Sequence, residues 1–83
     1  MRYYLHLRDG QDIAIDQEGL EFRTISSLQD AMRKAARDII AGDVKRGVLD
    51  LNLRIDAETQ SGQLVCSLPF SSALSIAPMQ VAA

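Results

Sequence analysis

The sequence lacks most of the features with which small proteins reinforce a thin core. Its 83 residues include one cysteine, one histidine, two prolines and no tryptophan. One cysteine cannot form an intrachain disulfide, and one histidine with one cysteine is too little for a structural zinc site. A chain of this length buries only about 60–65% of its unfolded surface. We therefore expect association with a second copy to supplement the core.

The chain also lacks a strong charge of either sign and a long apolar run. Nine basic residues oppose eleven acidic ones, which gives a formal net charge of −2. Such a balance predicts neither a nucleic-acid partner nor binding to an anionic membrane. No apolar run approaches the roughly 20 residues of a membrane span, and residues 1–8 contain no apolar leader segment. Together with an unpaired cysteine, these absences predict a cytoplasmic protein.

What is present is the composition of a folded domain. Hydrophobic residues make up 47% of the chain and charged residues 24%, and both values are ordinary for globular proteins. The last residues, 77–83, carry no periodic pattern. We expect one domain over residues 1–76, followed by a disordered tail over 77–83.

The N-terminal residues predict a β-hairpin. Residues 2–8 alternate between apolar and polar side chains, which is the period of a half-buried strand. Asp9 and Gly10 suit a tight turn, and residues 12–16 alternate again. A polar loop over 16–19 follows, with Leu20 and Phe22 as its expected anchors to the core.

The clearest element is a helix over about 27–45. Ser26 and Ser27 are each followed three residues later by an acceptor, which predicts a capped N-terminus. Gly47 follows two basic residues, as is typical just after a helix. The apolar stripe expected to face the sheet has helical spacing and comprises Leu28, Ala31, Met32, Ala35 and Ile39.

Two further strands are expected after the helix. Residues 49–57 alternate strictly, Ser61 and Gly62 supply a turn, and residues 63–70 alternate again. Pro69 cannot donate a backbone hydrogen bond, so the last strand ends there or lies at a sheet edge. The order strand, strand, helix, strand, strand predicts an α+β fold. Its four-stranded antiparallel sheet would carry the helix on one face.

Two segments resemble an uncharacterised family of short bacterial proteins. The segments are Arg2-Tyr3-Tyr4-Leu5-His6-Leu7-Arg8-Asp9-Gly10 and Asp16-x-Glu18-Gly19. Members of that family open with RYYFHLRDG and continue with a D-x-E-G loop, so Leu5 stands where the family has phenylalanine. The resemblance extends over residues 2 to about 76. Because this family is a domain of unknown function, it implies the domain boundaries and no activity.

A more general similarity of pattern exists with HicB-type antitoxins. Those proteins also run from an N-terminal antiparallel sheet into an alanine-rich helix, bind a small toxin and dimerise. By analogy, this similarity implies a regulatory domain that binds a partner.

His6 is the only histidine, and it lies in the polar phase of the first strand. With a carboxylate such as Asp9 or Asp16 it could act as a general base. No nucleophile or second base accompanies it, and this favours a surface imidazole paired with an acid on a neighbouring strand or loop. We expect no catalytic residue and no enzyme, and keep an enzyme using His6 as the weaker alternative.

Acidic and basic residues are unevenly distributed along the chain. Five acids and no base lie between Asp9 and Glu21, in a spacing that does not follow an EF-hand loop. Five bases and two acids lie between Arg33 and Arg46 without an interleaved aromatic residue. Solvated loop and helix faces explain both segments, although together they could steer a partner. We expect no metal, no cofactor and no nucleic acid.

The residues therefore favour a small non-enzymatic protein-interaction module over the other hypotheses. It would self-associate, as a homodimer, through strand edges or the open sheet face. Cys66 falls in the apolar phase of the last strand, and we interpret it as a buried structural thiol. The candidate interaction surface lies on the sheet face away from the helix and comprises Tyr4, His6, Arg8, Asn52 and Arg54.

Overall fold

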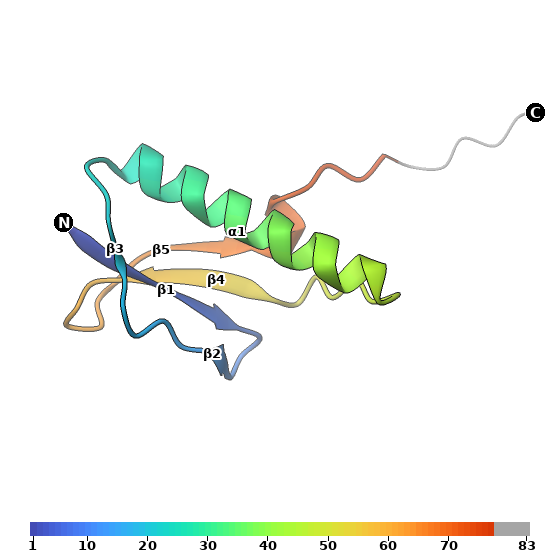
Figure 1. The fold of residues 1–83 in the computed structure, drawn as a ribbon, viewed down its shortest axis with the longest axis horizontal. Helices are drawn as coiled ribbons and strands as arrows, with labels where there is room; N and C mark the ends of the chain where they lie inside the picture. Colours follow the sequence, from blue (N-terminus) through green and yellow to red (C-terminus); the bar gives the residue numbers. More distant parts are fainter. Residues whose placement is uncertain (78–83) are drawn as a thin grey trace, which may run out of the picture.

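Five short strands and one long helix make up the fold in the computed structural model, which describes residues 1–77. The elements are β1 Arg2–Arg8, β2 Asp12–Ala14, β3 Leu20–Glu21, α1 Ile25–Lys45, β4 Arg54–Glu58, β5 Leu64–Pro69 and the 3₁₀ turn η1 Phe70–Ser72. Helix α1 lies across one face of the antiparallel sheet (Figure 1). The predicted α+β class is confirmed, but the sheet has five strands rather than four.

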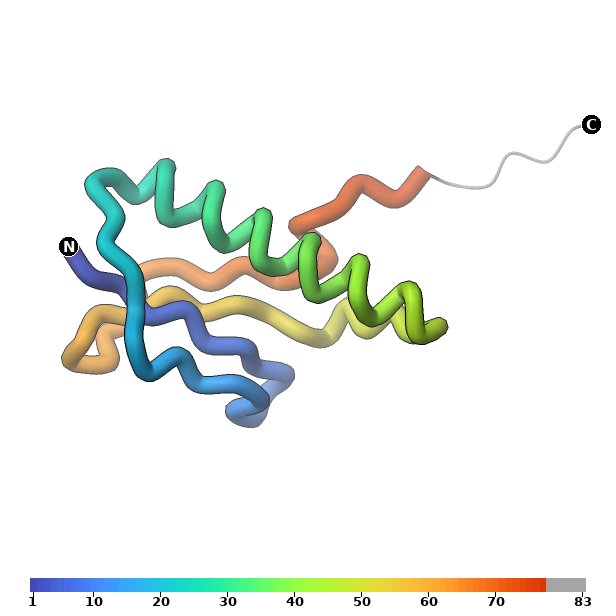
Figure 2. Tube along the Cα trace, viewed as in Figure 1, coloured from blue at the N-terminus to red at the C-terminus, as the bar shows by residue number. Residues whose placement is uncertain are grey.

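The sheet is built around β1. Its strands lie in the order β2-β1-β4-β5. Strand β3 pairs with the first residues of β1, and β2 pairs with the last residues of β1. The chain after β2 runs back along β1 before it rises to α1 (Figure 2). The predicted hairpin is confirmed, with a second strand of only three residues.

The fifth strand corrects the prediction of a loop anchored by Leu20. Leu20 lies opposite Tyr3 in the β1–β3 pair, and its side chain is 62% exposed. Phe22 does pack on the core, with its ring centre 6.3 Å from that of Tyr3. A two-residue strand has no alternation that a sequence could show, because its pairing depends on the neighbouring backbone of β1.

Helix α1 begins two residues earlier than predicted, at Ile25. Thr24 is the N-cap, and its side-chain oxygen accepts a hydrogen bond from the backbone N–H of Ser27 at 3.0 Å. The prediction that Ser26 or Ser27 caps the helix was therefore wrong. The C-terminal prediction is confirmed, since α1 ends at Lys45 and Gly47 follows with φ +82°.

The core lies between α1 and the sheet. The predicted stripe is shifted slightly, because Ala36 and Ile40 are buried while Ala35 and Ile39 are only partly buried. The C-terminal turns of α1 extend past the strands (Figure 1), and Val44 is half exposed there. The buried apolar residues are Tyr3, Leu28, Met32, Ala36, Ile40, Leu53, Ile55, Ala57, Phe70 and Ala73.

The strand predicted over residues 49–57 is confined to β4, which begins at Arg54. Residues 51–52 form a turn, and the Asp50 carboxylate accepts a hydrogen bond from the N–H of Asn52 at 2.9 Å. Leu49 is 51% exposed, whereas Leu53 is buried. The alternating leucines at residues 49–53 therefore belong to a loop that precedes β4, not to a strand. Of the predicted tail over 77–83, only Ala77 is among the described residues.

Candidate functional site

The sheet face that α1 leaves uncovered carries a cluster of polar side chains, here called the polar face. Cross-strand neighbours on it are Tyr4 with Glu58 and His6 with Asp56. The residues of the polar face are Tyr4, His6, Arg8, Arg54, Asp56, Glu58 and Ser67. Because this face has no helix over it, its charged groups must satisfy one another or remain in water.

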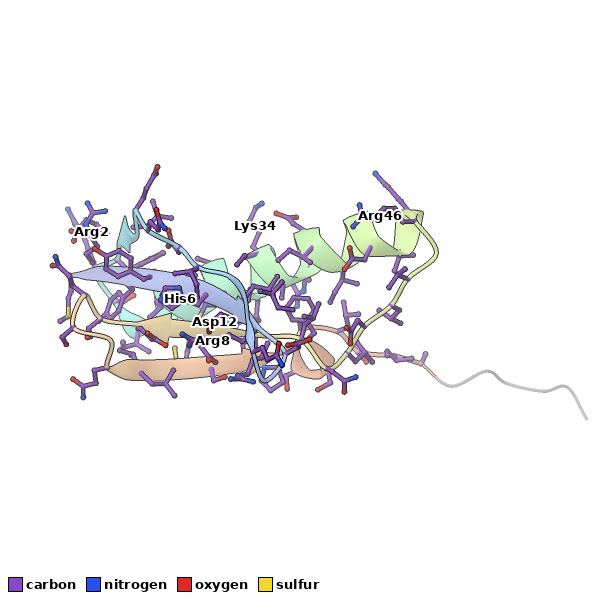
Figure 3. The ribbon with its side chains drawn as sticks, turned by 90° about the horizontal axis from the view of Figure 1, so that it is seen from below. Arg2, His6, Arg8, Asp12, Lys34 and Arg46 are labelled. Carbon is purple, nitrogen blue, oxygen red and sulfur yellow. The ribbon has the colours of Figure 1, made fainter. Side chains whose placement is uncertain are left out.

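Arg8 is the centre of this cluster. Its guanidinium donates hydrogen bonds to Glu58, to Asp12 at 2.6 Å and to Asp56 at 3.0 Å. These bonds, that of Glu58 first, raise the pKa of Arg8. Figure 3 shows Arg8 and Asp12 close together beside β1. Through these bonds the Arg8 side chain, which comes from β1, connects to both β2 and β4.

Asp56 is the most buried charged residue of the polar face, at 4% exposure. Its carboxylate accepts hydrogen bonds from the Ser67 hydroxyl at 2.5 Å, from Arg8, and from Arg54 at 3.2 Å. Burial alone would raise the pKa of Asp56, but these donors outweigh it and lower the pKa. Asp56 therefore separates two arginines that lie directly opposite each other on neighbouring strands.

The His6 ring is buried and has a partner at each nitrogen. Nδ1 accepts a hydrogen bond from the backbone N–H of Asp16 at 3.1 Å, and Nε2 lies 3.5 Å from a carboxylate oxygen of Glu58. The ring thus joins the 15–19 loop to β4.

Asp16 organises that loop. One carboxylate oxygen accepts from the N–H groups of Glu18 and Gly19, and the other accepts from the N–H of Leu5 on β1. Burial opposes the charge, but the backbone donors of Gly19, Leu5 and Glu18 outweigh it and lower the pKa of Asp16. Gly19 has φ +70°, and a Cβ there would lie 2.9 Å from the carbonyl oxygen of Tyr3. The roles of Asp16 and Gly19 in this loop are therefore structural: they hold the loop against β1.

The acidic segment has partners within the fold rather than an open arrangement of ligands. Asp9 accepts from a backbone N–H in its own turn, and Asp12 pairs with Arg8. Glu21 pairs with the N-terminal ammonium group and with Arg2. Over residues 1–77, no group of three or more His, Cys, Asp or Glu side chains could hold a metal ion.

The basic residues of α1 and its C-cap Arg46 are also largely paired. Arg33 binds Asp30, Lys34 binds Asp38 at 2.8 Å, and Arg46 binds Asp43. Arg37 donates to the backbone carbonyl of Ala73 at 2.8 Å. These pairings reduce the positive potential that a phosphate-binding helix face would need. Within the described residues, no helix is long and apolar enough to cross a membrane.

Four of the five residues predicted as an interaction surface come together on the polar face, and Asn52 lies in the turn before β4. His6 is 8% exposed, and only 19% of the Arg8 side chain is exposed, so both act mainly within the fold. Tyr4 and His6 line a shallow cleft of about 340 Å³. Asp16, Gln17, Glu58, Thr59, Gln60 and Gly62 complete its lining.

The outer edge of β5 is the feature that sequence reasoning did not single out. Strand β5, LVCSLP, has no charged residue, and Leu64 and Val65 are 56% and 36% exposed. Among residues 1–77, no strand pairs with this edge. Cys66 is half-buried, with its Sγ 3.4 Å from Sδ of Met32, and burial raises the pKa of its thiol. The interpretation of Cys66 as a structural thiol fits this environment.

Over residues 1–77, the structure is a small helix-on-sheet domain whose polar face is internally hydrogen-bonded and whose outer strand β5 is uncharged. The chain belongs to the family described as a domain of unknown function, DUF6894, whose model matches residues 2–71. No curated protein and no solved structure matches it. The match agrees with the expected family, a domain of unknown function, and adds no activity.

Proposed function

We propose that the protein is a small non-enzymatic protein-interaction module that self-associates through the outer edge of β5. The carrying observation is that this edge is uncharged and, among residues 1–77, unpaired, with Leu64 and Val65 exposed. Proteins usually protect such an edge with charges, prolines, β-bulges, very short strands or a covering segment, because it readily pairs with another strand. Strand β5 has no charge, but a bulge at its start and Pro69 at its end leave only its middle residues open. Strand addition at an open edge is a common mode of protein recognition.

The polar face is a weaker candidate for the main contact. Its buried side chains have hydrogen-bond partners within the chain, and in the described residues no buried side-chain nitrogen or oxygen lacks one. A partner would have to replace those bonds, which costs about 1–3 kcal/mol for each buried polar group left unpaired. The same pairings leave little support for His6 as a base or for α1 as a phosphate-binding helix.

Charge favours a second copy of the chain as the partner at β5. Two β5 strands bring no charged residues together. Two β2 edges would bring together acidic segments that include Asp9, Asp12 and Asp16. Like charges directly opposite one another destabilise a strand pair. Self-association is therefore best accommodated at β5.

The test is the mass of the protein in solution, measured by sedimentation from micromolar to millimolar concentration. The β5 variant is Leu64→Lys/Val65→Lys. The matched control is Ile13→Lys/Leu20→Lys, which places two lysines at exposed apolar positions on β2 and β3, 52% and 62% exposed. We expect a dimer for the wild type and the control, and a monomer for the β5 variant. A wild-type protein that stays monomeric throughout would overturn the proposal.

A further inference from the structure

The register of β4 and β5 determines which backbone groups point out of the sheet. The N–H of Phe70 donates to the carbonyl of Leu53 at 2.9 Å, and this pair continues the β4–β5 register. In an antiparallel ladder, hydrogen-bonded pairs recur at every second residue. Leu68 therefore directs its backbone groups to β4. The backbone groups of Ser67 and Pro69 are directed to the outer edge.

Ser67 supplies the one N–H group on the regular part of that outer edge, residues 66–69. Pro69 points outward too, but it has no N–H, which explains why the ladder tolerates it. The register shifts between Ala57 and Glu58, and Val65 is the extra residue opposite that shift. The first residues of β5 thus form a bulge, which is a poor template for a further strand.

Only some registers allow two copies of β5 to pair. Antiparallel pairing of identical strands places a twofold axis perpendicular to the sheet. Residues directly opposite each other must then share a sheet face, because side-chain direction alternates along a strand. The axis can therefore pass between two Cys66, two Ser67 or two Leu68 residues, but in the last case Pro69, which has no N–H, would lie opposite Ser67 and one hydrogen bond of that pair would be lost. A pair centred on Ser67 spans 65–69, whereas one centred on Cys66 spans 64–68 and includes more of the bulge.

We propose that β5 pairs antiparallel with β5 of a second copy, with Ser67 directly opposite Ser67 of that copy. The two Ser67 residues exchange N–H to carbonyl hydrogen bonds across the axis. This inference rests on the proposed self-association and names its register. It places both α1 helices on the same side of one continuous sheet.

A groove beside β5 supports this register. It has a volume of about 130 Å³ and lies between α1 and β5. Its lining is half apolar and half polar and comprises Gln29, Met32, Arg33, Cys66, Ser67 and Leu68. In the Ser67-centred pair, Leu68 of the second copy lies opposite Cys66 and on the same sheet face as the groove. Each copy would then add an aliphatic side chain to the groove of the other, which buries apolar surface at both ends of the pair.

Amide hydrogen exchange of the unmodified protein tests the pairing directly. In a monomer the Ser67 amide faces water, whereas the Leu68 amide is bonded to β4. At concentrations where the mass is dimeric, we expect Ser67 to exchange about tenfold or more slowly than at dilution. Leu68 should change far less. A dimer whose Ser67 amide stays unprotected would overturn the inference.

Disulfide trapping tests the register. In Cys66→Ser/Ser67→Cys, the two new thiols would have Cα atoms about 5.5 Å apart, within disulfide reach. With oxidised glutathione, the two thiols become one disulfide and the oxidant is reduced to two glutathione molecules. We expect this variant to form a covalent dimer. Wild-type Cys66 should not, because its diagonal Cα separation is about 7–8 Å.

The outcomes separate the register from the proposed function. Cross-linking of wild-type Cys66 in place of the Ser67→Cys variant would establish the Cys66-centred register and overturn ours. A dimeric mass without either cross-link and without Ser67 protection would overturn pairing at Ser67 while leaving self-association intact. A monomeric mass would remove the proposed function itself. Because the exchange measurement uses the wild type, poor folding of the cysteine variant does not weaken the test.

Discussion

Single residues in the 15–19 loop connect the loop to β1. Asp16 binds three backbone N–H groups, including that of Leu5. Arg2 donates to the backbone carbonyl of Glu18 at 2.6 Å from the β1 side. Gly19 allows the close approach, because its missing Cβ would collide with the backbone of Tyr3. These contacts account physically for the residues that carry the family resemblance.

Gly19→Ala tests this explanation. The left-handed conformation costs an L-residue about 1–2 kcal/mol, and the new Cβ would also lie 2.9 Å from the Tyr3 oxygen. We expect a loss of about 3 kcal/mol in the free energy of unfolding, measured with urea. The matched control is Gly62→Ala, which has φ +87° and open space around the added methyl group. It should lose only about 1–2 kcal/mol. Equal losses would show that the close approach is unimportant.

The side-chain phase of β1 could be predicted from the sequence, but the role of its polar residues could not. Alternation correctly placed Tyr4, His6 and Arg8 on the face away from the helix. Their burial depends on partners that lie far apart in the chain, such as the backbone N–H of Asp16 for His6 and the carboxylate of Glu58 for Arg8. Periodicity describes one strand at a time, so it cannot show which loop will bind an imidazole or a guanidinium.

At the scale of elements, long periodic segments were predicted best. Helix α1 was found within two residues at its start, since its apolar spacing recurs over about three turns, from Leu28 to Ile40. The two-residue β3 was missed, and residues 49–53 were assigned to a strand that begins at Arg54. A run of alternating leucines is compatible with a half-buried strand and also with a loop in which one leucine is buried. Only the packing of Leu53 under the helix decides between them.

The start of α1 provides a test at this scale. Thr24 accepts the hydrogen bond of the Ser27 N–H, whereas Ser26 is exposed within the first turn. We expect Thr24→Ala to lower the free energy of unfolding by about 1 kcal/mol, the usual cost of losing an N-cap. Ser26→Ala, the control, should stay within about 0.5 kcal/mol of the wild type. Urea titrations followed by circular dichroism measure both. A larger loss for Ser26→Ala would restore the capping box predicted at that residue.

At the scale of the whole molecule, the two edges of the sheet differ in kind. The β2 and β3 edge is made of short strands flanked by acids, and the β5 edge is longer and uncharged. The sequence predicted that Pro69 lies at a strand end or on an edge strand. In the structure Pro69 is the last residue of β5, and β5 is an edge strand. The sequence could not show the order of strands, because that order depends on contacts between β1 and β4. The open edge became visible only with the topology.

Acid stability is a property of the whole molecule because Asp16 and Asp56 join separate strands and loops. In the folded protein, burial opposes the charge of each carboxylate, but hydrogen-bond donors outweigh burial and lower the pKa of both Asp16 and Asp56. Their contribution is therefore fully present above the unfolded pKa of about 3.9, and it is lost as the pH falls through the lower folded values. The free energy of unfolding should fall between about pH 5 and pH 2.

The variants Asp16→Asn and Asp56→Asn should separate this charge effect from packing. At pH 7 we expect Asp56→Asn to lose about 2–3 kcal/mol, because its bonds to Arg8 and Arg54 are charge-assisted. On acidification each variant should lose less further stability than the wild type, and the double variant should lose least. Urea unfolding at pH 7, 5 and 3, performed at one concentration, measures these slopes. If the double variant lost stability with acid as steeply as the wild type, carboxylates other than these two would control the acid response.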